Sequence, residues 1–151
     1  MASHKQSDPG AEAWHALWQF FLRNKGRMIA LAQEYDLAPM QMHALRVLEP
    51  GTTRTMREVA DALLCDPSNV TGIVDRLEAR GLIERTAAPH DRRAKLLAVT
   101  AEGERVRAEI DRRLRQPPPA ITALSLTEQR TLRDLMHKVL TATEQPPPVR
   151  T

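Results

Sequence analysis

The sequence predicts a mainly α-helical protein with one small β-hairpin placed directly behind a helix-turn-helix unit. Apolar residues recur at helical spacing over most of the chain, and aromatic residues make up only 3% of it. A core of small aliphatic side chains favours packed helices over an aromatic-rich β-sandwich. After Gly81 the apolar period changes, and two short strand-like runs there predict the hairpin.

The chain is long enough for one domain with a hydrophobic core. We expect a single domain over residues 11–143, between a disordered tail at 1–10 and a polar, Pro-rich tail at 144–151. Cys65 is the only cysteine, so no intrachain disulfide forms. The start lacks a signal-peptide pattern, and no apolar run reaches the length of a membrane span. These observations predict a cytoplasmic protein without membrane contact.

A long helix is predicted from Ala11 to about Tyr35. Its apolar residues recur at three- and four-residue steps, and they are Leu17, Phe20, Phe21, Met28, Leu31 and Ala32. Trp14 and Trp18 lie one turn apart on a related face. We expect them to pack in a core or a dimer seam, and a position beside a ligand pocket is the alternative.

Two shorter helices follow. Ala38-Pro39 begins the first, since Pro is tolerated in a first turn, and Pro50-Gly51 ends it. The second begins at a capping box in which the Thr55 hydroxyl and the Glu58 carboxylate satisfy each other's backbone N–H groups. The residues expected on its buried side are Val59, Ala60, Leu63 and Leu64.

The next helix has strong signals at both ends. Asp66 is an N-cap followed by Pro67 at the first helical position, and Gly81 closes the helix. Its buried positions are Val70, Ile73, Val74 and Leu77. Only a few residues separate it from the preceding helix, which is the layout of a helix-turn-helix unit.

The hairpin and the last helices follow in order. Strands are predicted at 82–86 and 95–99 around a charged turn. Thr100 caps another helix, with Val106, Ile110 and Leu114 as its apolar positions. The run at 117–119 is all proline and ends this helix, because proline has no backbone N–H and clashes with the preceding turn. A final helix opens near Ser125 or Thr127.

Three segments together resemble the MarR family of winged helix-turn-helix transcriptional regulators: 56–60, 67–85 and 91–103, the last with Asp91-Arg92-Arg93 and Thr100-x-x-Gly103. The resemblance implies a winged unit at 38–100 flanked by dimerisation helices at 11–36 and 101–143. It further implies a homodimer that acts at a palindromic operator, in most cases as a repressor. The proline run departs from the family, which commonly has a longer helix there.

The exposed face of the helix after Asp66 suits the reading of double-stranded DNA. Its first turns would enter the major groove, where each base pair shows a distinct donor and acceptor pattern. Asn69 can pair with an adenine edge, and Thr71 offers a hydroxyl and a methyl group to thymine. Ser68 and the helix N-terminus can hold a phosphate. A plain solvated helix face is the alternative.

Three further residues join this candidate interface. Gly72 costs a helix about 1 kcal/mol relative to Ala, which suggests a close approach, either to a DNA groove or to a neighbouring helix. Arg76 is placed for a phosphate or a guanine edge, with an ion pair to Asp75 or near Glu78 as the alternative. Thr55 is a weaker candidate for phosphate, because capping alone explains it.

The hairpin tip is basic, with Asp91 as the only carboxylate that we assign to it. The basic residues assigned to it are Arg85, Arg92, Arg93 and Lys95. The negative potential of a minor groove attracts such side chains. In the family, the carboxylate that corresponds to Asp91 pairs with the arginine that corresponds to Arg93, and that arginine reaches the groove. A mobile charged tip is the alternative.

The remaining signals are weaker. A small-molecule effector is expected in a pocket between the dimerisation helices and the winged unit. The candidate lining residues are Trp14, Trp18, Met40, Met42 and His43, although core packing is the favoured role for each. No catalytic constellation, metal-ligand spacing or cofactor motif appears, so we expect neither an enzyme nor a bound cofactor, although a zinc site of distant His and Glu stays open. Oxidation of Cys65 beside the helix start would make a redox sensor. A protein-interaction module without DNA binding is the other alternative.

Overall fold

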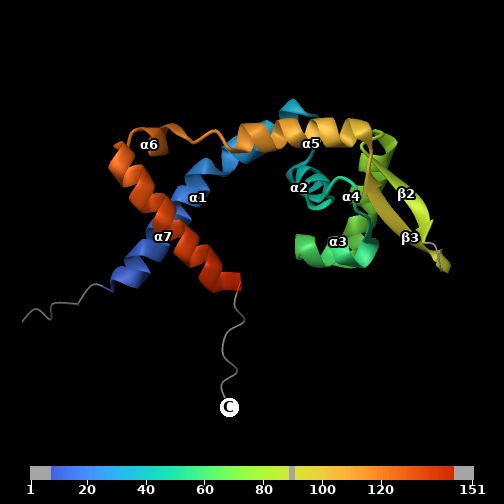
Figure 1. The fold of residues 1–151 in the computed structure, drawn as a ribbon, viewed down its shortest axis with the longest axis horizontal. Coiled ribbons are helices and arrows are strands. Elements are labelled where there is room, and N and C mark those ends of the chain that lie inside the picture. Colours follow the sequence, from blue (N-terminus) through green and yellow to red (C-terminus); the bar gives the residue numbers. More distant parts are fainter. Residues whose placement is uncertain (1–7, 89–90, 145–151) are drawn as a thin grey trace, which may run out of the picture. The chain divides into compact units, whose positions relative to one another are not determined.

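The computed structural model describes the backbone of residues 8–88 and 91–144, and their side chains except those of 88, 91–94 and 144. The chain divides into two compact units, Met1–Asp111 and Arg112–Thr151, which are described separately. The elements of the first are α1 (Pro9–Glu34), α2 (Pro39–Val47), β1 (Arg54–Thr55), α3 (Met56–Leu63), α4 (Pro67–Ala79), β2 (Ile83–Ala88), β3 (Asp91–Val99) and most of α5 (Ala101–Leu114) (Figure 1). The second holds the end of α5, α6 (Pro119–Thr122) and α7 (Leu126–Glu144). The predicted fold class, mainly helical with a small β-hairpin wing, is confirmed.

Helix α1 begins at Pro9, because the Asp8 side chain caps it by accepting from the Gly10 N–H at 2.9 Å. The predicted tail at 1–10 is therefore wrong at Pro9 and Gly10, and residues 1–7 lie outside the described residues. Leu31 and Ala32, near the end of α1, are buried. Most other apolar side chains of α1 are exposed within the chain, namely Trp14, Trp18, Phe20, Phe21, Leu22, Met28 and Ile29. Packing of Trp14 and Trp18 in this chain's own core is thus wrong.

The core of the first unit lies where α2, α3 and α4 meet the sheet and α5. Its largest fully buried side chains are Met42, Leu45, Leu48, Val59, Val70, Val74, Leu77, Ile83, Leu97 and Ile110. Burial of each such side chain stabilises the fold by about 1.5–3 kcal/mol relative to its exposure. The helix-turn-helix is thereby fixed as one packed unit.

Leu64 does not belong to the buried side of α3. Its side chain is 94% exposed. Leu64 is the C-cap of α3 in the left-handed conformation, with φ 51°, and its N–H donates to Asp61 O at 3.2 Å. The chain leaves the helix at this residue, so the helical spacing that predicted burial no longer applies.

The sheet has three strands in the order β1-β3-β2, all antiparallel to their neighbours. The hairpin is longer than predicted, with Ile83 opposite Val99 and a register irregularity between Ala87 and Ala88. Strand β1 was not predicted: Arg54 pairs with Leu97 and Thr55 with Leu96. Two residues are too short for a periodic signal, so pairing with β3 alone defines this strand.

The start of α5 is tied to the turn between α4 and β2. As predicted, Thr100 caps α5: its hydroxyl donates to Gly81 O at 2.6 Å and accepts from Gly103 N at 3.1 Å. The Thr100 N–H donates to Leu82 O at 3.1 Å. Gly81 has φ 67°, which glycine tolerates without strain. Thr100 and Gly103 therefore dock α5 on the end of the recognition unit.

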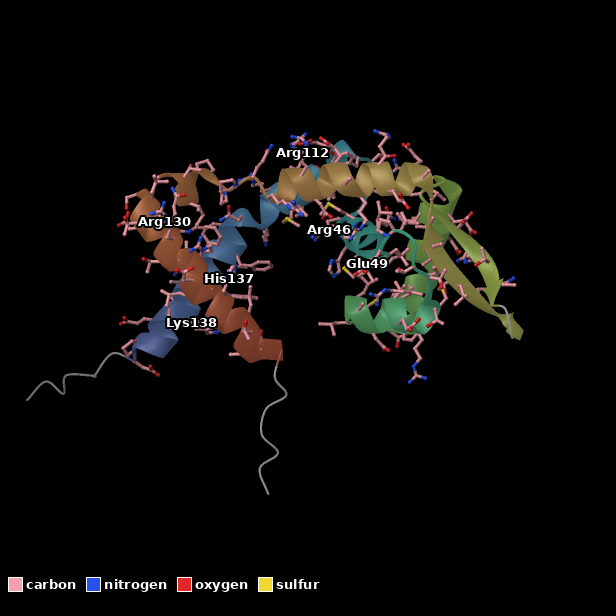
Figure 2. All side chains as sticks on the ribbon, viewed as in Figure 1. Arg46, Glu49, Arg112, Arg130, His137 and Lys138 are labelled. Atoms are coloured by element: carbon pink, nitrogen blue, oxygen red, sulfur yellow. The ribbon has the colours of Figure 1, made fainter. Side chains whose placement is uncertain are left out.

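Helix α5 is also joined to α2 by one ion pair and one hydrogen bond. The Arg46 guanidinium, labelled in Figure 2, contacts Asp111 with Nε to Oδ1 at 2.6 Å. Arg107 donates from Nε to Arg46 O at 3.3 Å. These contacts fix α5 along the side of the core that α2 forms.

In the second unit, α5 ends at Leu114, before the proline run, as predicted. The short helix α6 was not predicted. Helix α7 follows Ser125, which forms a capping box: Ser125 N–H donates to Glu128 Oε2 at 2.8 Å, and Glu128 N–H to Ser125 Oγ at 3.3 Å. The hydrogen bonds from Ser125 lower the pKa of Glu128. Within residues 8–88 and 91–144, no helix is long and apolar enough to cross a membrane.

Candidate nucleic-acid interface

The N-terminus of α4 is capped by Asp66. Its Oδ1 accepts from the Ser68 N–H at 2.8 Å and from the Ser68 hydroxyl at 2.6 Å, and both bonds lower the pKa of Asp66. The hydroxyl hydrogen of Ser68 is therefore engaged within the protein. A phosphate contact from Ser68 stays a prediction, and it would require this hydroxyl to turn or the backbone N–H groups to act.

The outer face of α4 carries exposed polar side chains that make no polar contact in the described part of the chain. Asn69, Thr71 and Arg76 are exposed. In the described part of the chain, none of the three side chains has a hydrogen-bond or ion-pair partner. At 3.6 residues per turn, Asn69 and Arg76 lie on the flank of α4 nearer α2, and Thr71 lies on the flank nearer β2. The alternative of an ion pair between Arg76 and Asp75 is not what the structure has.

Gly72 lies in the middle of this outer face. A Cβ atom built on Gly72 would meet no described atom within 4 Å. Close packing against a neighbouring helix of the same chain, one of the two explanations for this glycine, is therefore wrong. A close approach by a bound partner remains as a prediction.

Thr55 acts as the predicted helix cap of α3. Its hydroxyl donates to Glu58 Oε2 at 2.9 Å and accepts from the Glu58 N–H at 3.2 Å, while the Thr55 N–H donates to Glu58 Oε2 at 2.7 Å. The backbone hydrogen bond from Thr55 is the main cause that lowers the pKa of Glu58. A phosphate contact by Thr55 stays a prediction.

The three wing residues of the candidate interface fall at the start of β3. The backbone of Asp91, Arg92 and Arg93 belongs to that strand, and Asp91 pairs with Ala88 across the hairpin. Their side chains lie outside the described residues, and so do Pro89 and His90. The ion pair between Asp91 and Arg93 and the minor-groove contact stay predictions.

Arg85 does not add free positive charge to the wing. Its Nη2 contacts Asp75 Oδ1 at 2.5 Å, and its Nη1 donates to Glu78 Oε2. The hydrogen bond to Asp75 is the main cause that raises the pKa of Arg85. Nothing in the sequence separates Arg85 from the other arginines of the wing, since the pairing depends on how the hairpin packs against α4.

The predicted effector pocket is not assembled within the described chain. Met42 belongs to the core, with 2% of its surface exposed, whereas Met40, His43, Trp14 and Trp18 are exposed. Trp18 instead stacks on Phe21, with ring centroids 5.7 Å apart. For Met42 the competing role, packing in the core, is therefore the one that the structure has.

Two open grooves lie along α4 instead. One of about 250 Å³ is lined by Ala38, Met40, Gln41, Asn69, Gly72, Ile73 and Arg76. The other, of about 620 Å³, is lined by Gln33, Asp36, Leu37, Ala38, Gln41, Arg76, Ala79 and Arg80. Gln41 is only 7% exposed, and its Oε1 accepts from the Ala38 N–H at 3.0 Å. Of the five predicted pocket residues, Met40 alone lines either groove.

The other candidate chemistries gain no support from the geometry. Among the described residues, no group of three or more His, Cys, Asp or Glu side chains could hold a metal ion. Cys65 is half-buried, and its thiol is free.

Comparison with known proteins gives two relatives and one solved structure of similar fold. HTH-type transcriptional repressor MdtR of Bacillus subtilis (strain 168) is 32% identical over 89 residues, which is 59% of this chain and 57% of MdtR. YdcH of the same organism, an uncharacterised HTH-type transcriptional regulator, is 32% identical over 72% of this chain and 74% of its own length. A mutant of S. aureus MepR bound to an oligodeoxyribonucleotide has a TM-score of 0.60 at 21% identity, over 86% of this chain and 97% of the MepR chain, a likeness of fold alone.

The share of each chain that is matched limits what the comparisons establish about this protein. The chain spans about half the length of the first curated relatives that it matches. The model of the MarR family matches residues 35–94, which run from the end of α1 into β3. YdcH, at 32% identity, is matched over 74% of its length and extends the likeness beyond that segment. On this evidence, with the winged helix-turn-helix fold, the chain belongs to the MarR family of transcriptional regulators.

Proposed function

We propose that this protein is a sequence-specific, cytoplasmic regulator that binds double-stranded DNA as a homodimer at a palindromic operator and represses transcription there. The observation that carries the proposal is the outer face of α4, where Asn69, Thr71 and Arg76 are exposed and have no partner in the described chain. A helix that only solubilised the fold would have no need of a glycine at the centre of that face. Gly72, which lies there, costs helix stability of about 1 kcal/mol.

The chemistry of these side chains fits a major groove. An asparagine amide pairs with the N6 and N7 edge of adenine, and an arginine guanidinium with the O6 and N7 edge of guanine. Asn69 and Arg76 lie on one flank of α4, two turns apart, so both would face the same groove at bases that are not adjacent. The relatives agree with this assignment: MdtR is named a repressor, and the MepR mutant was solved bound to an oligodeoxyribonucleotide.

The test is selection of bound duplexes from a random pool, followed by affinity measurements at two salt concentrations. We expect a palindrome whose half-sites lie about one helical turn apart, and an affinity that falls steeply with salt through counterion release. Absence of duplex binding at low salt would overturn the proposal and favour a protein-interaction module.

The proposal of a homodimer is supported by apolar surface that one chain leaves exposed. On α1 this surface includes the stacked Trp18 and Phe21, and on α7 it includes Leu135, Val139 and Leu140. Exposed patches of this kind mark interaction sites in soluble proteins.

We expect the double variant Trp18→Glu/Phe21→Glu to be monomeric at micromolar concentration, because charge on this surface opposes its burial against a second copy. Analytical ultracentrifugation measures the change. Arg130→Glu is the control and should leave the dimer intact, because Arg130 is exposed on the opposite side of α7 from Val139. A monomeric parent protein, or a double variant that stays dimeric, would remove these side chains from the interface.

Gly72→Ala should have opposite effects on stability and on DNA binding. The free protein should gain about 1 kcal/mol in unfolding free energy, since alanine favours helix and the added methyl group meets no described atom. Affinity for the operator duplex should fall, because that methyl group enters the space between α4 and the groove. Urea unfolding and fluorescence anisotropy measure the two effects. Unchanged affinity would place the DNA away from Gly72.

We further propose that a small-molecule effector binds in the grooves along α4. Apolar walls there combine with donors from Arg76 and from the Gln41 amide nitrogen, which has no partner among the described residues. A small organic anion fits this lining, and in the groove that includes Asn69 it would compete directly with DNA. Release of operator duplex by small carboxylates, lost in Gln41→Met, would support the site, and release that persists in the variant would place it elsewhere.

A further inference from the structure

We infer that Arg85 is a positioning residue for DNA binding: it bridges β2 to two carboxylates of α4, and so sets the wing against the recognition helix and masks negative charge beside the DNA. The inference rests on the proposed function. It concerns a residue that itself makes no DNA contact.

The Arg85 guanidinium contacts two carboxylates of α4 at the same time. The two terminal nitrogens of the guanidinium are divided, Nη2 to Asp75 Oδ1 at 2.5 Å and Nη1 to Glu78 Oε2. The Arg85 side chain is 23% exposed, compared with 56% for Asp75. A planar guanidinium can hold two carboxylates at once, whereas a lysine ammonium lacks this fixed fork. Arg85 is therefore committed to α4 and is poorly placed to reach a phosphate.

The bridge lies at the base of the wing. Arg85 is opposite Leu97 in the ladder between β2 and β3, near the end where Ile83 enters the core. The backbone path from α4 to β2 is short, with the Gly81 N–H donating to Glu78 O at 2.8 Å and the Leu82 N–H to Leu77 O at 3.0 Å. Fixing Arg85 on α4 just beyond this turn limits the angle at which the hairpin leaves the helix. That angle decides whether α4 and the wing tip meet adjacent grooves together.

The bridge also acts on the electrostatics of the interface. Asp75 lies on the outer face of α4, beside Arg76 and one turn beyond Thr71. Without Arg85, Asp75 and Glu78 would present two uncompensated carboxylates toward the phosphates, and like charges across an interface are unfavourable. Removing the arginine should therefore harm binding more than removing all three charges together.

The test compares Arg85→Gln, Asp75→Asn/Glu78→Gln and the triple variant that combines them. Operator affinity and its salt slope are measured for each, and urea unfolding shows whether each is folded. We expect Arg85→Gln to weaken binding by about 10-fold at low salt and by less at high salt, because salt screens the repulsion between the two carboxylates and the phosphates. The triple variant should return to within about 3-fold of the parent, since it removes the uncompensated acids. Arg85→Lys should lie between the parent and Arg85→Gln.

The opposite results are equally specific. A salt slope reduced by about 1 in Arg85→Gln, with no recovery in the triple variant, would make Arg85 a phosphate contact and overturn the inference. Parent-like affinity in Arg85→Gln would overturn it as well. Failure of the parent protein to bind any duplex would instead reject the proposed function.

If Arg85→Gln does not fold, the comparison of Asp75→Asn/Glu78→Gln with the triple variant decides whether Arg85 bridges the acids or contacts a phosphate. With the acids already absent, removal of the arginine should leave the salt slope unchanged if it only bridges, whereas a slope lower by about 1 again marks a phosphate contact.

Discussion

Gly103→Ala is expected to destabilise the protein by about 3 kcal/mol and to lower its melting temperature by roughly 6–12 °C. A Cβ atom at this position would lie 1.9 Å from Leu82 O and 2.7 Å from Val99 Cγ2. The first of these atoms belongs to the backbone, and it already accepts the Thr100 N–H at 3.1 Å. Neither can move without lifting the start of α5 from the turn between α4 and β2. Chemical unfolding monitored by circular dichroism measures the loss.

The matched control is Gly72→Ala, the same chemical change on an exposed helix face with no described atom near the new methyl group. Its expected gain of about 1 kcal/mol has the opposite sign. If Gly103→Ala proved neutral, α5 would not dock on Leu82 in solution. The Thr100-x-x-Gly103 pattern would then have no packing role. The result also bears on function, because α5 leads from the recognition unit toward the C-terminal helices.

Much of this fold was predictable because the signals for its helix ends lie in a few neighbouring residues. The Thr55 and Asp66 caps, the left-handed Gly81 and the Thr100 cap depend on neighbouring residues and on backbone chemistry that holds in any protein. Two apolar runs predicted the two strands of the hairpin, although both strands are longer in the structure. Strand β1 could not be predicted in this way, because only pairing with Leu96 and Leu97, more than forty residues later in the chain, gives Arg54 and Thr55 their strand character.

The candidate site was predictable in outline and less so in detail. Periodicity identified which face of α4 is buried, and hence that Asn69 and Arg76 are exposed. It did not show that Arg85 would be held by Asp75 and Glu78, since charge counted along a sequence carries no information on pairing across elements. The predicted burial of Leu64 was wrong for a related reason. Its backbone is left-handed, so the chain leaves the helix there and the side chain no longer follows the helical spacing.

Asn69→Ala combined with Arg76→Ala should reduce affinity for the operator by about 100-fold or more and leave the fold intact. Each side chain is exposed and has no partner in the described chain, so neither loss leaves an unsatisfied group behind. Each base-edge contact contributes about 1–3 kcal/mol of discrimination. Competition between operator and scrambled duplex separates lost recognition from lost charge.

The control for charge is Arg105→Ala on α5, an exposed arginine paired with Glu102 at 2.6 Å. It also removes one positive charge, but away from α4, so operator affinity should change by less than about 3-fold. If Asn69 and Arg76 read bases, the double variant loses preference for the operator over scrambled duplex, and Arg105→Ala keeps it. If the two side chains only hold phosphates, operator and scrambled duplex weaken together and the salt slope falls. The ratio of the two affinities therefore decides whether this flank of α4 specifies sequence or only positions the protein on DNA.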